Sequence, residues 1–474
     1  MTFPEHIFKA YDIRGLAASE LSPELAYRLG RAFVVFLRNH NLWQANQAVV
    51  VGYDMRETSA ALQEALIRGI REEGVSIVDV GLVSTPLFNF ACAHYPEHAG
   101  GIMVTASHNP AEYNGFKMTL GDGLPVGEAF GMGEIKELVM KGENNESPPN
   151  MSFPRKRESS GNGFPIKSGM TVKKNVLPDY LKKIFSLVTP KSLKPLKVVI
   201  DAGNGMAKAT FPEMLNKLPV TVEYLYLEPD GNFPNHEANP LKVETLRNLQ
   251  KKVVEFGADF GFALDGDADR IGLVDEKGEV VDASIVGALV GLEVLQTHPK
   301  SHMLYDVRSS MIIPELWQAR GATVEMCKVG HANIKKTLKE NGGAFASELS
   351  LHLYYHDMYD VESTDLSLLY VLQLLSREQK PLSQIISPLK KYFHSGEINF
   401  KIEDKIAVMN AIEEKYKAEA QEISHLDGLW MKFNWGWLSI RLSNTEPVLR
   451  LNLEAKTKEV MEEKKNELSK FIQA

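Results

Sequence analysis

A serine stands in the run Thr-Ala-Ser-His-Asn-Pro at residues 105–110. The run follows apolar residues 101–104, which predict a strand, and its Asn-Pro pair favours a turn. A serine on a turn after a strand is presented at a fixed angle, which suits a hydroxyl that carries a covalent group. Ser107 is therefore a candidate carrier, although an ordinary polar turn is the alternative.

A second run, Asp-Gly-Asp-Ala-Asp-Arg, occupies residues 265–270 between two predicted strands, 260–264 and 271–274. Carboxylates at alternate positions of such a loop can converge on one hard cation. An EF-hand needs glycine at the sixth position, where this chain has Arg270, and it needs flanking helices. We therefore expect Mg²⁺ at this loop, and a solvated acidic turn stays open.

Two further loops carry polar groups. Residues 347–352 read Ser-Glu-Leu-Ser-Leu-His, which fits a helix start or a buried polar cluster as well as a site. Residues 441–447 read Arg-Leu-Ser-Asn-Thr-Glu-Pro, and Arg450 follows. Guanidinium and hydroxyl donors match the oxygens of a phosphate monoester, so this loop is a candidate phosphate site, with a polar β-turn as the alternative.

The elements that must position these loops alternate between strands and helices. Strands are predicted at 48–52, 75–80, 197–200 and 303–307, and helices at 59–73, from about 210, and at 312–320. This order predicts three related α/β domains with mainly parallel, mixed sheets. From about residue 395 the order is strand, charged helix (405–421), strands (429–433, 437–442, 449–453) and helix, which predicts a smaller α+β domain.

One segment, residues 142–175, has little periodicity and many turn formers. It predicts a flexible linker or insertion, with a functional basic arm as a weaker alternative. The predicted organisation is 1–142, a flexible 143–175, 176–279, 280–394 and 395–474.

Composition excludes several classes of protein. The chain has 474 residues, a formal net charge of −8 and two cysteines. The negative charge argues against a general nucleic-acid binder, and two cysteines give no disulfide framework. The sequence shows no signal peptide and no apolar run long enough to cross a membrane, so we expect a cytoplasmic protein with no membrane partner.

Together the four loops resemble one family, the α-D-phosphohexomutases, and most closely its bacterial phosphomannomutase/phosphoglucomutase branch. The resemblance spans nearly the whole chain and includes Lys-Ala-Tyr-Asp-Ile-Arg-Gly at 9–15, Asp-Ala-Gly-Asn-Gly at 201–205 and Val-Gly-His at 329–331. It implies a heart-shaped molecule with one loop from each of four domains facing a central cleft.

The resemblance also implies roles for individual residues. Ser107 is expected to carry phosphate and to bind one Mg²⁺ together with Asp265, Asp267 and Asp269. Expected catalytic residues are Ser107, His108, Lys117, Arg270, His331 and His352. Expected substrate-binding residues are Tyr11, Arg14, Arg308, Glu348, Ser350, Arg441, Ser443, Asn444, Thr445 and Arg450.

The sequence departs from the family pattern at the expected sugar loops. Ser347 and Leu351 stand where the family usually has glycine, and Arg308 stands where it usually has lysine. If either glycine position has a positive φ, Leu351 is strained or crowds the site. Tyr53 and Met55 replace the common Arg and Gly of another family motif. Phosphoryl transfer is therefore better supported than sugar selection.

The expected activity is interconversion of hexose 6-phosphate and hexose 1-phosphate, with a hexose 1,6-bisphosphate as activator. Mannose and glucose are the expected sugars, and glucosamine phosphate is left open. We expect a monomer, with a dimer not excluded. The alternatives are a catalytically weakened sugar-phosphate-binding homologue and a hydrolase that loses its phosphoserine to water.

Overall fold

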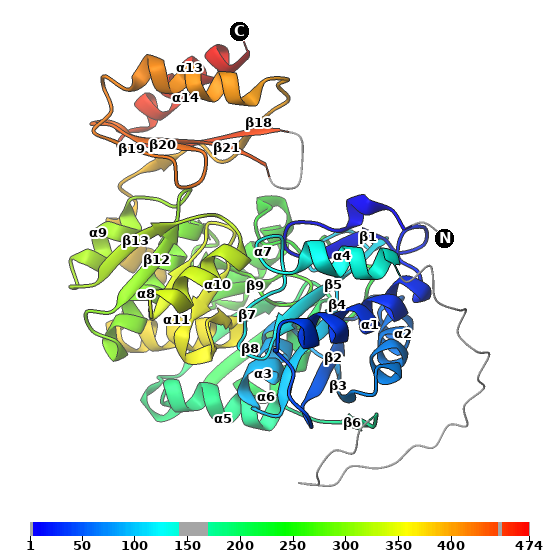
Figure 1. Cartoon of the computed structure of the whole chain (residues 1–474). Coiled ribbons are helices and arrows are strands. Elements are labelled where there is room, and N and C mark those ends of the chain that lie inside the picture. The colour runs from blue at the N-terminus through cyan, green and yellow to red at the C-terminus, as the bar shows by residue number, and fades with distance from the viewer. Residues whose placement is uncertain (1–2, 142–168, 444–447, 474) are drawn as a thin grey trace.

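The computed structural model describes residues 3–141, 169–443 and 448–473. Within them the chain forms four sheets, each covered by helices (Figure 1). None of the helices in these ranges is long and apolar enough to cross a membrane.

The first domain contains a sheet in the order β1-β5-β4-β2-β3-β6. Its central strands β2 and β4 are buried almost throughout, and β2 carries a run of three valines. Helices α1 and α2 pack against each other beside this sheet. Its elements are β1 (Ile13–Leu16), α1 (Pro23–Asn39), β2 (Ala48–Tyr53), α2 (Ser59–Glu72), β3 (Ser76–Leu82), α3 (Thr85–His94), β4 (His98–Val104), β5 (Tyr113–Leu120), α4 (Met132–Lys141) and β6 (Thr171–Lys173).

Strand β6 corrects one expectation. Residues 143–175 were predicted to be flexible, but Thr171–Lys173 pairs in parallel with β3 and extends the first sheet. A three-residue strand gives no measurable periodicity, so this edge was hidden in the sequence. Residues 142–168 lie outside the described residues.

The second and third domains have related five-stranded sheets, in the orders β11-β10-β9-β7-β8 and β13-β12-β14-β15-β16. The second contains α5 (Leu177–Leu187), β7 (Leu196–Asp201), α6 (Phe211–Leu215), β8 (Val220–Leu225), α7 (Arg247–Phe256), β9 (Phe260–Leu264), β10 (Ile271–Asp275) and β11 (Val280–Val281). The third contains α8 (Ala283–Thr297), β12 (His302–Asp306), α9 (Ile312–Gln318), β13 (Thr323–Cys327), α10 (His331–Glu340), β14 (Phe345–Ser347), β15 (Leu353–Tyr355), β16 (Val361–Glu362), α11 (Thr364–Glu378) and α12 (Leu382–Ile386).

The three α/β sheets are mixed in the same way. In each, parallel strands fill one side and antiparallel strands close the other edge, as at β4-β5-β1, β9-β10-β11 and β14-β15-β16. The predicted α/β class is confirmed, with more antiparallel pairing than strand–helix alternation alone suggests. The loops that enter these antiparallel edges carry Ser107, the three aspartates and the sugar loop.

The fourth domain has an antiparallel sheet with two helices on one face, as predicted (Figure 1). Its elements are β17 (Phe393–His394), β18 (Ile398–Phe400), α13 (Lys405–Tyr416), β19 (Glu422–Ser424), β20 (Leu429–Lys432), β21 (Gly436–Leu442), β22 (Leu449–Ala455) and α14 (Lys458–Gln473).

The fourth domain has a hydrophobic core that is separate from those of the other three domains. One hydrophobic cluster runs through parts of the first, second and third domains, whereas the fourth encloses a cluster of its own. A small cluster of Val307, Trp430 and Trp437 joins the fourth domain to the third. Because few apolar contacts hold this junction, we expect the fourth domain to be the most mobile of the four.

Candidate active site

A cavity of about 740 Å³ lies where the four domains meet. Its walls include Ser107 from the first domain, Asp269 from the second, His331 from the third and Arg450 from the fourth. Other predicted residues at the wall are Tyr11, Arg14, His108, Lys117, Arg270 and His352. Each of the four domains thus contributes to the cavity wall, the fourth through Arg450 of β22.

Ser107 sits on a tight turn just beyond β4. Its φ is +51°, in the left-handed region, and the Thr105 Oγ1 atom accepts a 2.9 Å hydrogen bond from its N–H. The residue is only 2% exposed and forms part of the cavity wall. A non-glycine residue held in this conformation costs on the order of 1 kcal/mol, and such strain clusters at functional sites.

Arg56 holds the serine loop from behind. Its guanidinium donates hydrogen bonds of 2.5–2.9 Å to the carbonyl oxygens of Ser107, Asn109, Pro110 and Tyr113. The charge is balanced by buried Asp54, 3.3 Å from Arg56 Nε. One buried side chain thereby holds three carbonyls of the loop between β4 and β5 and the first carbonyl of β5.

The three aspartates converge, as predicted, on the loop between β9 and β10. One ligand atom from each of Asp265, Asp267 and Asp269 lies within 4.8 Å of the others. The Asp265 Oδ1 atom accepts from the N–H groups of Asp269 (3.0 Å) and Arg270 (3.2 Å), which folds the loop around its own carboxylate.

This donor set fits a hard cation. All three carboxylates are buried, and the Asp267 Oδ1 atom has no hydrogen-bond partner among the described residues. Burial, followed by the charges of Asp269 and Asp267, raises the pKa of Asp265 well above its usual value. A buried carboxylate oxygen without a donor and carboxylates that repel one another are stabilised by a divalent ion.

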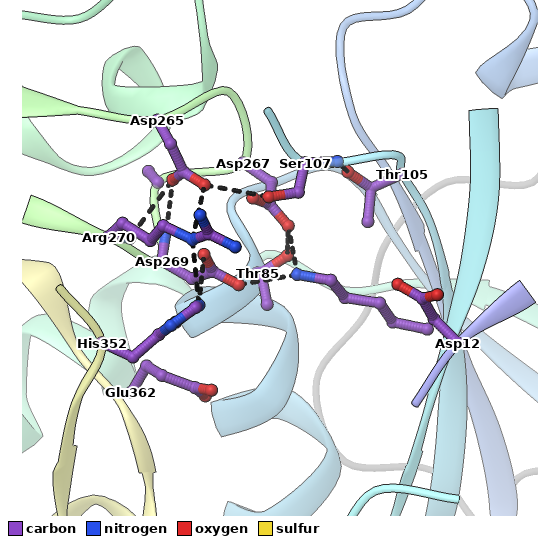
Figure 2. Close-up of polar contacts among 12 residues, drawn as sticks. Asp12, Thr85, Thr105, Ser107, Asp265, Asp267, Asp269, Arg270, His352 and Glu362 are labelled. Carbon is purple, nitrogen blue, oxygen red and sulfur yellow. Dashed lines mark hydrogen bonds and ion pairs between the residues drawn. The ribbon is translucent and has the colours of Figure 1, made fainter. Parts of the chain in front are cut away.

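The serine and the aspartate loop meet directly. The Ser107 hydroxyl donates a 2.9 Å hydrogen bond to Asp265 Oδ2 (Figure 2). The Ser107 oxygen also lies 3.2 Å from His108 Nδ1. Ser107 and Asp265 come from different domains, so their contact also fixes how the first and second domains are aligned.

Lys117 and Thr85 complete the acidic cluster. The Lys117 ammonium lies 2.7 Å from Asp267 Oδ2 and 2.6 Å from Asp269 Oδ2. Burial acts against this charge, yet the two aspartates raise the pKa of Lys117 above its usual value. The Thr85 hydroxyl, at the start of α3, donates a 2.6 Å hydrogen bond to Asp267 (Figure 2).

The expected sugar loop lies in the third domain, just beyond β14. Glu348 accepts from Arg308 Nη2 and the Gly330 N–H, both at 3.2 Å, and from the Tyr354 hydroxyl at 2.8 Å. Burial acts to raise the pKa of Glu348, but His352 and Arg308 lower it well below its usual range. Glu348 is therefore ionised and, like Arg308, well buried.

His352 links this loop to the aspartates. Its Nε2 atom lies 3.3 Å from Asp269 Oδ1 and its Nδ1 atom 3.5 Å from Glu348 Oε2. Burial acts to lower the pKa of His352, but Asp269 and Glu348 raise it to about 9. The ring therefore joins the second and third domains, and its Nε2 atom also lies 3.3 Å from Arg270 Nε.

The two unusual residues of the sugar loop behave differently. Leu351 has a φ of +69° and is buried, so the strain expected at a missing glycine is present there. Ser347 ends β14 in extended backbone and needs no such conformation. Its buried Oγ atom has no hydrogen-bond partner among the described residues.

The fourth-domain loop is described in part. The Arg441 side chain is buried, and its Nε atom lies 3.0 Å from Asp427 Oδ2. The Arg441 Nη1 atom has no hydrogen-bond partner among the described residues. Arg450 reaches the cavity, and Ser443 follows β21. Asn444 and Thr445 lie outside the described residues. Arg308, Glu348, Ser350 and Arg441 are not part of the cavity wall itself.

Several residues that contribute to the site were not predicted. Arg56 and Thr85 support the serine and the aspartates, and Lys335 forms a buried 2.7 Å ion pair with Glu362 at the cavity wall. Asn89 Nδ2 lies 3.4 Å from the same Glu362 carboxylate. The available signals were the Asp-Met-Arg run at 54–56 directly after a buried strand, and the Ser-Thr-Pro run at 84–86, which is typical of a helix start.

Comparison with known proteins gives a consistent result. Models of the phosphoglucomutase/phosphomannomutase alpha/beta/alpha domains I, II and III match residues 5–146, 178–278 and 282–392, and the model of the C-terminal domain matches 397–470. A phosphomannomutase of Vibrio cholerae is 36% identical over 474 residues, covering 98% of each chain.

Two further relatives cover nearly the same span. A phosphomannomutase/phosphoglucomutase of Pseudomonas aeruginosa is 33% identical, covering 97% of this chain and 94% of that protein. A crystal structure of a phosphoglucomutase/phosphomannomutase family protein from Burkholderia thailandensis has a TM-score of 0.87 and 30% identity, covering 100% of this chain and 98% of that one. The chain therefore belongs to the phosphoglucomutase/phosphomannomutase family of mutase enzymes.

Proposed function

We propose that this chain interconverts hexose 6-phosphate and hexose 1-phosphate, with mannose, glucose or both as the sugar, through a phosphoserine at residue 107 and a bisphosphorylated hexose intermediate. The contact of the Ser107 hydroxyl with Asp265, at a cavity lined by cationic side chains, carries the proposal. The names of the relatives support the same substrate class.

The residues have complementary parts in the transfer. The phosphoryl group leaves the Ser107 oxygen and bonds to the oxygen of a sugar hydroxyl, which gives its proton to a base. The Ser107 oxygen keeps the electron pair of the broken P–O bond and takes up one proton, so that the serine hydroxyl is restored. His331, which lines the cavity, is our candidate for that base. Arg270 and Lys117 balance the phosphoryl charge.

Asp265, Asp267 and Asp269 would hold one Mg²⁺, together with the serine oxygen. When bound, Mg²⁺ supplies Lewis-acid stabilisation of phosphoryl oxygens. The sugar is expected at Glu348 and Ser350, and its other phosphate at Arg441, Ser443, Asn444, Thr445 and Arg450. A bisphosphorylated hexose would then turn within the cavity before returning its second phosphate to the serine, with a hexose 1,6-bisphosphate as activator. We place the enzyme in the cytoplasm as a monomer.

The Ser107→Ala variant tests this proposal. Mannose 1-phosphate and glucose 1-phosphate are supplied separately with Mg²⁺ and bisphosphate, and formation of the 6-phosphate is followed. Loss of turnover is expected for Ser107→Ala and not for the exposed control Ser186→Ala. Unchanged turnover in Ser107→Ala would exclude the covalent route.

A second function is favoured by Leu351, whose strained, buried backbone occupies a family glycine position. A weakened homologue would bind hexose phosphate without isomerising it. Calorimetric binding by a protein that shows no turnover with Mg²⁺ and bisphosphate would establish this second function.

A further inference from the structure

Glu397 lies between two arginines of different domains. It lies between β17 and β18, two strands of the fourth-domain sheet. Its Oε2 atom lies 3.8 Å from Arg308 Nη1, in the third domain, and its Oε1 atom lies 3.3 Å from Arg450 Nη1, on β22. Each carboxylate oxygen therefore faces a guanidinium of a different domain.

A further ion pair connects Glu397, through Arg308, to the sugar loop. The Arg308 Nη2 atom lies 3.2 Å from Glu348 Oε1. Alternating charges thus run from Glu348 through Arg308 and Glu397 to Arg450. This row begins at the carboxylate proposed to bind the sugar and ends at a cavity-lining arginine proposed to bind phosphate.

The row is shielded from water. The side chains of Arg308, Glu397 and Arg450 are 10%, 27% and 19% exposed. Charges this sheltered are screened little by salt. Without the carboxylate between them, the two guanidiniums would lose a common counter-ion across a boundary that has few apolar contacts.

The other carboxylates near Arg308 cannot make this link. Asp306, 2.6 Å from Arg308 Nη2, and Glu348 both belong to the third domain. The carbonyl of Arg308 also accepts a 3.1 Å hydrogen bond from His394 of β17, three residues before Glu397. Arg308 is therefore a point at which this part of the fourth domain contacts the third domain.

We propose that Glu397 is a positioning residue that couples Arg450 to Arg308, so that the phosphate and the sugar of a hexose phosphate are recognised together. The inference rests on the proposed function. Glu397 is not among the residues that line the cavity, whereas Arg450 is. Glu397 sets the position of one arginine according to the position of the other across the boundary between the third and fourth domains.

The test is a double-mutant cycle with Arg308→Lys and Arg450→Lys, made in the wild type and in Glu397→Gln. The KM for hexose 6-phosphate and its calorimetric Kd are measured for each protein, with inorganic phosphate as a second ligand. Exposed Glu403→Gln in the same domain is the matched control. Thermal midpoints confirm that each variant is folded.

Glu397→Gln is expected to raise the KM for hexose 6-phosphate about tenfold while changing kcat less than about threefold. Glu397→Gln is expected to raise the Kd for inorganic phosphate by a smaller factor, because this ligand has no sugar that could contact the third domain. The two arginine substitutions are expected to be non-additive in the wild type by about fivefold or more, and additive in Glu397→Gln.

Additive arginine effects in the wild type, or a coupling that persists in Glu397→Gln, would overturn the inference. An equal loss of affinity for hexose phosphate and inorganic phosphate would also overturn it, because Glu397 would then support Arg450 alone. Failure of the proposed function is distinguishable, since the wild type itself would then show no turnover.

Discussion

Gly287 of α8 lies against Ser347 of the sugar loop: a Cβ atom at residue 287 would lie 1.9 Å from the Ser347 Oγ atom and 2.8 Å from its Cβ. The extra hydroxymethyl group at a position usually held by glycine is therefore accommodated by a glycine on the facing helix. The Ser347 side chain thus fills the space that a side chain at residue 287 would need.

A double-mutant cycle can test whether side chains at residues 287 and 347 compete for the same space. Gly287→Ala should lower the free energy of unfolding by about 1–3 kcal/mol, because a packed site gains an atom. In a Ser347→Gly background the same change should be neutral or stabilise the protein by up to about 1 kcal/mol, since alanine is the better helix former. Urea unfolding of the four proteins checks the cycle, and additivity of the two changes would contradict shared volume.

Arg56→Lys should disturb catalysis more than binding. An ammonium cannot reach all four carbonyls that the guanidinium holds, so the Ser107 loop should lose its fixed position. We expect kcat to fall about 10- to 100-fold with little change in KM, as for small displacements of a reacting group. The control is Arg68→Lys on the exposed face of α2, and an unchanged kcat in Arg56→Lys would contradict the role.

Lys117→Met should make the fold depend on a divalent cation. Asp267 and Asp269 lose their shared ammonium, which should cost about 3–5 kcal/mol, as for other broken buried ion pairs. Mg²⁺ should therefore raise the thermal midpoint of Lys117→Met more than that of the wild type or of the exposed control Lys191→Met. Equal midpoint shifts in all three proteins would argue against a cation at the aspartates.

Glu454 should make stability depend on pH. Burial raises the pKa of this carboxyl to about 7, and it accepts hydrogen bonds from the Met311 N–H and the Trp437 indole at the boundary between the third and fourth domains. The folded state holds the proton more tightly than the unfolded one. The contribution is therefore fully present below the unfolded pKa of about 4.5 and is lost as pH rises through about 7.

Glu454→Gln should remove this dependence. At pH 8 the variant should be more stable than the wild type, by up to about 3 kcal/mol, and near pH 4.5 the two should converge. Urea unfolding followed by tryptophan fluorescence at both pH values is the measurement, with exposed Glu459→Gln as the control. A difference between variant and wild type that does not change with pH would count against the titration of Glu454.

The chemistry-bearing loops were predictable because their residues are consecutive. Ser107 and the three aspartates each follow a buried strand, so periodicity placed them at strand ends and their side-chain types indicated the chemistry. The sequence could predict strain at Leu351 only on the condition that this position has a positive φ. A sequence shows the residue type and not its backbone angle.

Contacts between distant segments were not predictable. Arg56 acts through backbone carbonyls, which have no sequence signature, and Gly287 is identified only by what faces it. Strand β6 is too short to show a period, and the antiparallel sheet edges were hidden because alternation of strands and helices does not specify direction. The division into domains at the predicted boundaries stays a prediction.

The hydrogen bond from Ser107 to Asp265 requires a proton that a phosphorylated serine no longer has. In the proposed cycle the same two residues would change from donor and acceptor to two anions, and the phosphorylated molecule would need more positive charge at this point. Phosphate occupancy and cation affinity would then be thermodynamically linked, each strengthening the other by the same factor. The supply of divalent cation would therefore help to determine what fraction of the enzyme is charged with phosphate.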